Sequence, residues 1–175
     1  MKTSLHRQLQ QRAADGRPVR VGLIGAGKFG SMYLAQIPRT PGVHLLGIAD
    51  LDPQAAWCNL ERVGWDAQRV RAQSLDAALR DGSTHVGDDW RALVRHAAVD
   101  VVVECTGSPV HAVEHCLEAF AHGKHVVNVT VEADALCGPL LARRAEHAGV
   151  VYSLAYGDQP ALICDLVDWA RTCGF

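Results

Sequence analysis

Short apolar runs alternate with segments of helical spacing along almost the whole chain. Val99–Cys105 is rich in β-branched residues, which is typical of a strand buried on both faces of a sheet. Val110–His122 instead has apolar residues at spacings of three and four, which predicts a helix ended by Gly123. Strands that alternate with helical crossovers predict an α/β fold, with a parallel sheet covered by helices on both faces.

The same pattern predicts six strands and eight helices. The strands are expected at Arg20–Ile24, Val43–Ala49, Thr84–Val86, Val99–Cys105, Val126–Val131 and Val150–Ala155. The helices are expected at Thr3–Ala14, Lys28–Ile37, Pro53–Val63, Leu75–Arg80, Trp90–His96, Val110–His122, Gly138–Ala148 and Pro160–Cys173. Residues 1–18 are then a helical extension, and residues 19–175 form one domain.

The chain length of 175 residues suits one domain of this kind. The last predicted helix reaches Gly174, so there is no room for a second domain. We therefore expect either a domain that acts alone or a truncated piece of a longer protein.

Composition narrows the choice of partners. The net charge is −2 with no long run of one sign, so no nucleic-acid or membrane surface is expected. No apolar stretch reaches membrane-spanning length, and Met1–Arg20 lacks the apolar centre of a secretory signal. The six cysteines include no C-x-x-C pair, which favours the reducing cytoplasm.

The strongest chemical signal is a glycine loop after the first predicted strand. Gly25, Gly27 and Gly30 form G-x-G-x-x-G at the start of a helix. The first glycine of this motif permits a tight turn, the second lets the backbone approach a pyrophosphate, and the third lets helix and strand pack closely. The motif predicts a Rossmann-type, doubly wound, six-stranded parallel sheet. Its cofactor contacts are expected at Gly25, Ala26, Gly27, Lys28, Phe29 and Gly30.

Asp50 ends the second predicted strand, twenty residues after Gly30. A carboxylate at this place accepts hydrogen bonds from the adenosine ribose and repels a 2′-phosphate, so NAD is favoured over NADP. Lys28 and Arg62 are nearby cations that could reverse this preference. The alternative interpretation is a structural glycine turn followed by a solvated Asp50.

Ligands of open parallel sheets bind beyond the carboxyl ends of the strands. Thr106 and Gly107 are expected there, beside the nicotinamide ribose. Glu132 is the best candidate at this edge for a substrate or metal contact and for a catalytic role. Asp134 and Asp158 are interpreted as helix caps, since a predicted helix follows each of them.

Three further features are given structural interpretations. Cys105 ends an apolar run and is assigned to the core. Lys124 starts a strand about 20 Å from the carboxyl edge and is taken as a charged residue after a helix. His111-Ala-Val-Glu114-His115 matches the H-x-x-E-H pattern of some zinc proteases. These three residues are expected to face mostly toward solvent, so no metal site is assigned. The buried stripe of their helix is predicted to be Val110, Val113, Leu117 and Phe120.

Three segments resemble the NAD-binding half of homoserine dehydrogenases. They are G-L-I-G-A-G-K-F-G at residues 22–30, D-V-V-V-E-C-T-G at 100–107 and H-G-K-H-V-V-N-V-T at 122–130. Residues 13–25 and the tail at 150–170 are similar to a subgroup that carries a SAF domain and includes a deoxyxylulose-phosphate-reductoisomerase-like oxidoreductase. The resemblance implies a second, substrate-binding domain and a homo-oligomer formed through it, which this chain does not contain.

Two departures bear on the substrate. Homoserine dehydrogenases carry T-A-N-K after G-K-H-V-V, whereas this chain has Asn128–Val131 there and lacks the lysine. Sugar dehydrogenases of the glucose–fructose oxidoreductase type carry E-K-P, whereas here Glu132 is followed by Ala133 and Asp134. Homoserine is therefore disfavoured as the substrate.

These patterns predict the cofactor-binding portion of an NAD(P)-dependent oxidoreductase that acts on a small polar hydroxy or oxo compound. We expect this chain by itself to bind cofactor without turning over substrate. The rival hypothesis is a dinucleotide-sensing binding module without chemistry. The weakest hypothesis is a metal-dependent hydrolase that uses His111 and His115.

Overall fold

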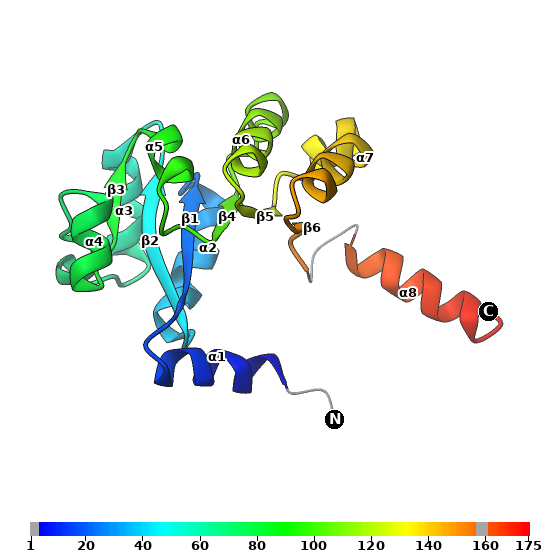
Figure 1. Cartoon of the computed structure of the whole chain (residues 1–175), viewed down its shortest axis with the longest axis horizontal. Helices are drawn as coiled ribbons and strands as arrows, with labels where there is room; N and C mark the ends of the chain where they lie inside the picture. The colour runs from blue at the N-terminus through cyan, green and yellow to red at the C-terminus, as the bar shows by residue number, and fades with distance from the viewer. Residues whose placement is uncertain (1–3, 157–160) are drawn as a thin grey trace.

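The computed structural model describes residues 4–156 and 161–175. Its strands form one parallel sheet in the order β3-β2-β1-β4-β5-β6 (Figure 1). The strand order changes direction between β1 and β4, which is the place where doubly wound sheets bind ligands. The prediction of a Rossmann-type six-stranded sheet is therefore confirmed. The strands are β1 (Val19–Ile24), β2 (Val43–Ala49), β3 (His85–Gly87), β4 (Val101–Glu104), β5 (His125–Asn128) and β6 (Tyr152–Leu154).

The helices follow the strands along the chain, and several begin where polar caps satisfy their first N–H groups. Asp52 Oδ1 accepts a hydrogen bond from Ala55 N at 3.0 Å, and Asp89 Oδ1 accepts one from Ala92 N at 2.8 Å. The α-helices are α1 (Leu5–Ala14), α2 (Lys28–Gln36), α3 (Pro53–Arg62), α4 (Leu75–Asp81), α5 (Trp90–Arg95), α6 (Pro109–Ala121), α7 (Val131–His147) and α8 (Ala161–Thr172). Two short 3₁₀ helices are η1 (Ile37–Arg39) and η2 (Ala67–Val70).

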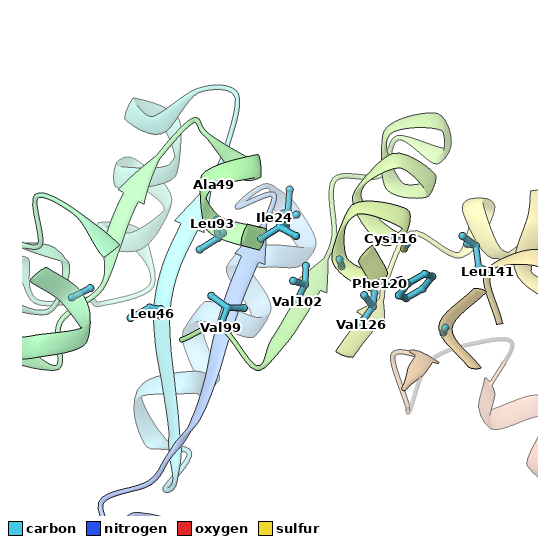
Figure 2. Close-up of a cluster of buried hydrophobic side chains, with 14 of the residues drawn as sticks. Ile24, Leu46, Ala49, Leu93, Val99, Val102, Cys116, Phe120, Val126 and Leu141 are labelled. Atoms are coloured by element: carbon cyan, nitrogen blue, oxygen red, sulfur yellow. The ribbon is translucent and has the colours of Figure 1, made fainter. Parts of the chain in front are cut away.

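Two apolar clusters cover the two faces of the sheet. One cluster joins β1 and β4 to α4, α5, α6 and α7, and Figure 2 shows Leu93, Phe120 and Leu141 reaching into it. The other cluster includes Leu34 of α2 and Leu60 of α3. Helices therefore lie on both faces, as the apolar strands predicted. This packing fixes the carboxyl ends of β1, β2 and β4 beside one another.

The predicted N-terminal helix is present as α1 and rests against the turn before β2. A Cβ atom on Gly42 would lie 2.1 Å from the carbonyl oxygen of Leu9, and Gly42 has a φ of +70°. Only glycine permits this close approach. The N-terminal extension thus packs at the amino end of the sheet, opposite the strand ends where ligands are expected.

The largest difference from the prediction lies in α7, which has an additional helical segment that starts at Val131. The β-branched residues after Asn128 were predicted to continue the strand to Val131, and the next helix was predicted to start at Gly138. The backbone leaves the helical conformation at Cys137, whose φ is −150°, so a second helical segment starts near Gly138, as predicted, with Pro139 in its first turn. Asp134 consequently lies within α7, and its prediction as the cap of a later helix is wrong.

The prediction for α6 is also partly wrong. Val110 and Leu117 are exposed, whereas Ala112, Cys116 and Ala119 are buried. Small side chains let the helix approach the sheet closely, so the buried face is set by them rather than by the largest apolar residues. Phe120 is buried as predicted.

The last helix, α8, extends away from the sheet beyond β6 (Figure 1). Its apolar side chains are exposed, namely Leu162, Ile163, Leu166, Val167 and Trp169. No helix within residues 4–156 and 161–175 combines the length and the apolar character needed to cross a lipid bilayer.

Candidate functional site

A cavity of about 460 Å³ lies at the carboxyl ends of β1, β2 and β4. Its lining includes seven of the nine predicted cofactor contacts: Gly25, Gly27, Lys28, Phe29, Asp50, Thr106 and Gly107. Ala26 and Gly30 shape the loop without lining the cavity. Residues that the sequence did not single out for cofactor binding also line it, among them Leu51, Asp88, Trp90, Ser108, His111 and His115.

The three glycines of the loop have different roles. Gly25 has a φ of +92°, and a Cβ there would lie 2.8 Å from the carbonyl oxygen of Cys105. A Cβ on Gly30 would lie 2.4 Å from the carbonyl oxygen of Gly25. Gly27, the N-cap of α2, has open space where a Cβ would stand. The first and third glycines therefore hold the loop together, and the second keeps room at the helix N-terminus for an anionic group.

Asp50 joins the end of β2 to this loop. Its Oδ2 accepts a hydrogen bond from Ala26 N at 2.7 Å, and its Oδ1 accepts one from Asp52 N at 3.0 Å. A carboxylate oxygen has two lone pairs, so each oxygen can accept a further bond from a ribose hydroxyl. Asp50 thus has the position and the acceptor capacity that the sequence predicted.

The two cations that could affect cofactor choice are placed differently. Lys28 lines the cavity. The guanidinium of Arg62 lies 3.1 Å from Asn59 Oδ1 and 3.3 Å from Ser31 Oγ, between α2 and α3 and outside the cavity lining. Asn59 in turn donates to the carbonyl of Ala26 at 2.9 Å, so Arg62 supports the glycine loop indirectly, through Asn59.

A fully buried carboxylate, Glu104, ends β4 next to the cavity. Its Oε1 accepts hydrogen bonds from Thr106 Oγ1 at 2.6 Å and from His115 Nδ1 at 3.2 Å. Its Oε2 accepts one from Thr130 Oγ1 at 2.5 Å, and Thr130 Oγ1 also accepts the N–H of Gly107 at 3.1 Å. Sequence reasoning missed this cluster. The available signal was an acidic residue at the end of a β-branched strand, since a buried charge needs partners.

The expectation that His115 faces solvent is wrong. Its relative exposure is 5%, and its ring meets Trp90 edge to face with centroids 4.4 Å apart. The small residues of α6 turn this side of the helix inward. His111, by contrast, is exposed and bonded through Nδ1 to Ser108 Oγ at 2.8 Å.

The side chains of the H-x-x-E-H pattern on α6 contact different partners. Glu114 forms an ion pair with Arg91, whereas His115 is bonded to Glu104. Among the residues that the structure describes, no group of three or more His, Cys, Asp or Glu side chains is arranged to hold a metal ion. The geometry therefore gives the metal-dependent hydrolase hypothesis no support.

Cys105 is buried, as predicted, with its Sγ 3.1 Å from the carbonyl oxygen of Gly25. Burial raises the pKa of its thiol to about 12, and the charges of Glu104 and Asp50 act in the same direction. The thiol is therefore protonated near neutral pH. A nucleophilic role would need the thiolate, so Cys105 is a core residue beside the site.

Lys124 follows the end of α6, as predicted, and its side chain makes contacts that the sequence did not indicate. It is buried at the amino end of β5, where Nζ donates to the carbonyl oxygens of Val99 at 2.8 Å and His96 at 2.9 Å. The ammonium group thereby joins β5 to the segment before β4. It lies outside the cavity lining.

Of the three carboxylates predicted at this edge of the sheet, Glu132 and Asp134 lie among the described residues. Glu132 is exposed in the first turn of α7 and lies outside the cavity lining. Asp134 Oδ1 accepts a hydrogen bond from the hydroxyl of Tyr152 at 3.0 Å, and Asn128 Nδ2 contacts the same hydroxyl at 3.1 Å. Asp158 lies outside the described residues. The role of Glu132 remains a prediction.

The fold and the cavity define a nucleotide-binding domain of the Rossmann class. The family model described as the NAD-binding domain of homoserine dehydrogenase matches residues 25–154, which is well over half of the chain. The chain belongs to this family.

The relatives are longer proteins. A 4-carboxy-2-hydroxymuconate-6-semialdehyde dehydrogenase from a Sphingobium species is 25% identical over 76% of this chain and 36% of its own length. Homoserine dehydrogenase from Thiobacillus denitrificans superposes with a TM-score of 0.62 at 21% identity, covering 78% of this chain and 29% of its own. GenD2 from gentamicin A biosynthesis, solved in complex with NAD, has a TM-score of 0.55 at 24% identity, covering 79% and 34%. The chain thus spans about a third of the length of these proteins.

Proposed function

We propose that this chain is the cofactor-binding portion of an NAD(P)-dependent oxidoreductase acting on a small polar hydroxy or oxo compound. The observation that carries the proposal is the open space at Gly27, at the N-terminus of α2, within a cavity that Asp50 also lines. The N-terminus of α2 at Gly27 suits a phosphate, and the carboxylate of Asp50 suits ribose hydroxyls. Membership of a family of NAD-binding domains from dehydrogenases supports the same function.

NAD is the preferred cofactor in this proposal. Asp50 would repel a 2′-phosphate, and the one cation discussed above that lies in the cavity lining is Lys28. The complex of GenD2 with NAD is consistent with this preference. A dominant contact from Lys28 to a 2′-phosphate would shift the preference to NADP.

We assign substrate positioning and proton transfer to a part of the protein outside this chain. Hydride transfer needs a substrate held in line with the nicotinamide and a proton donor within hydrogen-bond reach. We infer that a further domain supplies both, because the relatives are about three times as long. The chain alone would then bind cofactor without turnover, with Glu132 as its own contribution to substrate contact. Residues 1–18 would be an extension of the Rossmann domain at 19–175.

Further parts of the proposal rest on resemblance and composition. The tail at residues 150–170 favours the subgroup with a SAF domain. Assembly would be as a homo-oligomer through the further domain. Six free cysteines suit the cytoplasm.

The test is titration of the chain with NADH and with NADPH, followed by fluorescence or calorimetry. One site per chain is expected, with NADH bound more tightly. Gly27→Val should abolish binding and leave the melting temperature almost unchanged, because the added side chain enters the space for the pyrophosphate rather than the protein core. Binding by a folded Gly27→Val variant at the wild-type affinity would show that the cavity is not a dinucleotide site.

The rival hypothesis is a dinucleotide-sensing module. A dehydrogenase screen of small polyols, sugar acids and hydroxy acids separates the two functions when it includes the full-length product. NADH binding without turnover in the full-length protein would favour the sensing module. Turnover by residues 1–175 alone would show that the acid or base lies within this chain.

A further inference from the structure

Glu104 is a carboxyl group with no exposure to solvent. Burying a carboxylate is costly unless hydrogen bonds and an opposite charge replace water. Glu104 has donors for both of its oxygens: the hydroxyls of Thr106 and Thr130, and the ring of His115. Two of these partners, Thr106 and His115, also line the cavity.

The bonds to Glu104 determine what Thr106 offers to a ligand. The hydroxyls of Thr106 and Thr130 donate to the carboxyl oxygens of Glu104, so their protons point toward it. The lone pairs of Thr106 Oγ1 are then left for other donors. The N–H of Ser108 lies 3.3 Å from this oxygen and uses one of them. Because Thr106 lines the cavity, the other is available to a hydrogen-bond donor on a ligand.

Two nitrogens contact Glu104 Oε1, namely the backbone N–H of Thr106 at 3.3 Å and the ring Nδ1 of His115. The ring Nδ1 lies 3.2 Å from Glu104 Oε1, and in the arrangement that we propose Nδ1 carries the proton of this hydrogen bond. Trp90 packs edge to face against the ring and limits its rotation. The ring also lines the cavity, so the pair connects α6 and β4 directly to the ligand space.

We propose that Glu104 and His115 are positioning residues that make the loop at Thr106–Ser108 accept a hydrogen bond from a ribose hydroxyl or a carboxamide N–H of the bound dinucleotide. The inference rests on the proposed function. His115 acts through Glu104, and Glu104 acts through Thr106. Neither of the two positioning residues needs to touch the ligand.

The experiment is NADH titration of four single variants. His115→Leu should weaken NADH binding about tenfold, since it removes a hydrogen bond to a charged group. His115→Gln supplies an amide donor and should restore most of the affinity. Glu104→Gln should also weaken binding, because its amide group can donate to Thr106 and release the hydroxyl proton toward the ligand. His122→Gln, on the exposed end of the same helix, is the matched control and should bind as wild type.

A double-mutant cycle separates positioning from a general loss of stability. Thr106→Val removes the proposed acceptor, so adding His115→Leu to it should weaken NADH binding little further. Additive losses would overturn the proposal, and so would wild-type affinity in folded His115→Leu. If the leucine variant fails to fold, Glu104→Gln, alone and in the Thr106→Val background, gives the same comparison. Absence of NADH binding by the wild-type chain would instead overturn the proposed function.

Discussion

The carboxylate of Asp50, at the end of β2, accepts a hydrogen bond of 2.7 Å from the backbone N–H of Ala26 in the glycine loop. One side chain therefore both anchors the loop and offers acceptors to a ribose. Asn59 of α3 also stabilises Ala26, because its side-chain amide donates a hydrogen bond to the carbonyl oxygen of Ala26. The loop is held at its centre before any ligand arrives, which lowers the entropy cost of binding.

Asp50→Ala should weaken NADH binding by about tenfold and NADPH binding by less, since the loss of ribose acceptors affects both cofactors whereas the lost repulsion helps only the phosphorylated one. Parallel fluorescence titrations measure both constants. Asp52→Ala, which removes the cap of α3 outside the cavity lining, is the control for local loosening. An equal loss for the two cofactors would argue that Asp50 only braces the loop.

Gly25→Ala should destabilise the fold far more than Gly16→Ala. Both glycines have positive φ, at +92° and +63°, so each alanine carries the left-handed penalty of about 1 kcal/mol. A Cβ on Gly25 would also meet the carbonyl of Cys105 at 2.8 Å, whereas nothing lies within 4 Å of one on Gly16. Urea unfolding of the two variants measures the difference. Similar losses would mean that the contact between the loop and β4 is easily relaxed.

The thiols should separate into two reactive classes. Cys58, Cys164 and Cys173 are exposed and should react with a thiol reagent within minutes in the native protein. Cys105 and Cys116 should react only after unfolding, because burial raises the pKa of each to about 12. Mass spectrometry of the labelled protein identifies the sites. Rapid native labelling of Cys105 would reopen a chemical role for it.

The same two thiols make stability depend on pH. Their folded pKa values lie above the ordinary value of 9.0, so between that pH and about 12 the folded state binds more protons than the unfolded state. The free energy of unfolding should therefore fall as pH rises through this window. In Cys116→Ala the free energy of unfolding should fall less steeply with rising pH. Urea unfolding at several alkaline pH values would detect this difference.

Much of the fold follows from local patterns in the sequence. The apolar run Val43–Ala49 was predicted with the bounds that β2 has, because a strand buried on both faces leaves a continuous apolar signal. The spacing of Gly25, Gly27 and Gly30 predicted their separate roles, since each role depends on backbone geometry within a few residues. Asp50 was found in the same way, from its distance along the chain.

Only the tertiary structure decided which side chains the strand ends bring together. Glu104 and His115 are eleven residues apart and belong to a strand and a helix, so no period in the sequence joins them. The inward side of α6 depends on the packing of its small residues Ala112, Cys116 and Ala119, which are buried. Local spacing determines backbone conformation, whereas the burial of a polar group depends on contacts between distant segments. The sequence by itself therefore determined the sheet and its glycine loop, and packing decided that a buried carboxyl group lies beside the cavity, bonded to a histidine that lines it.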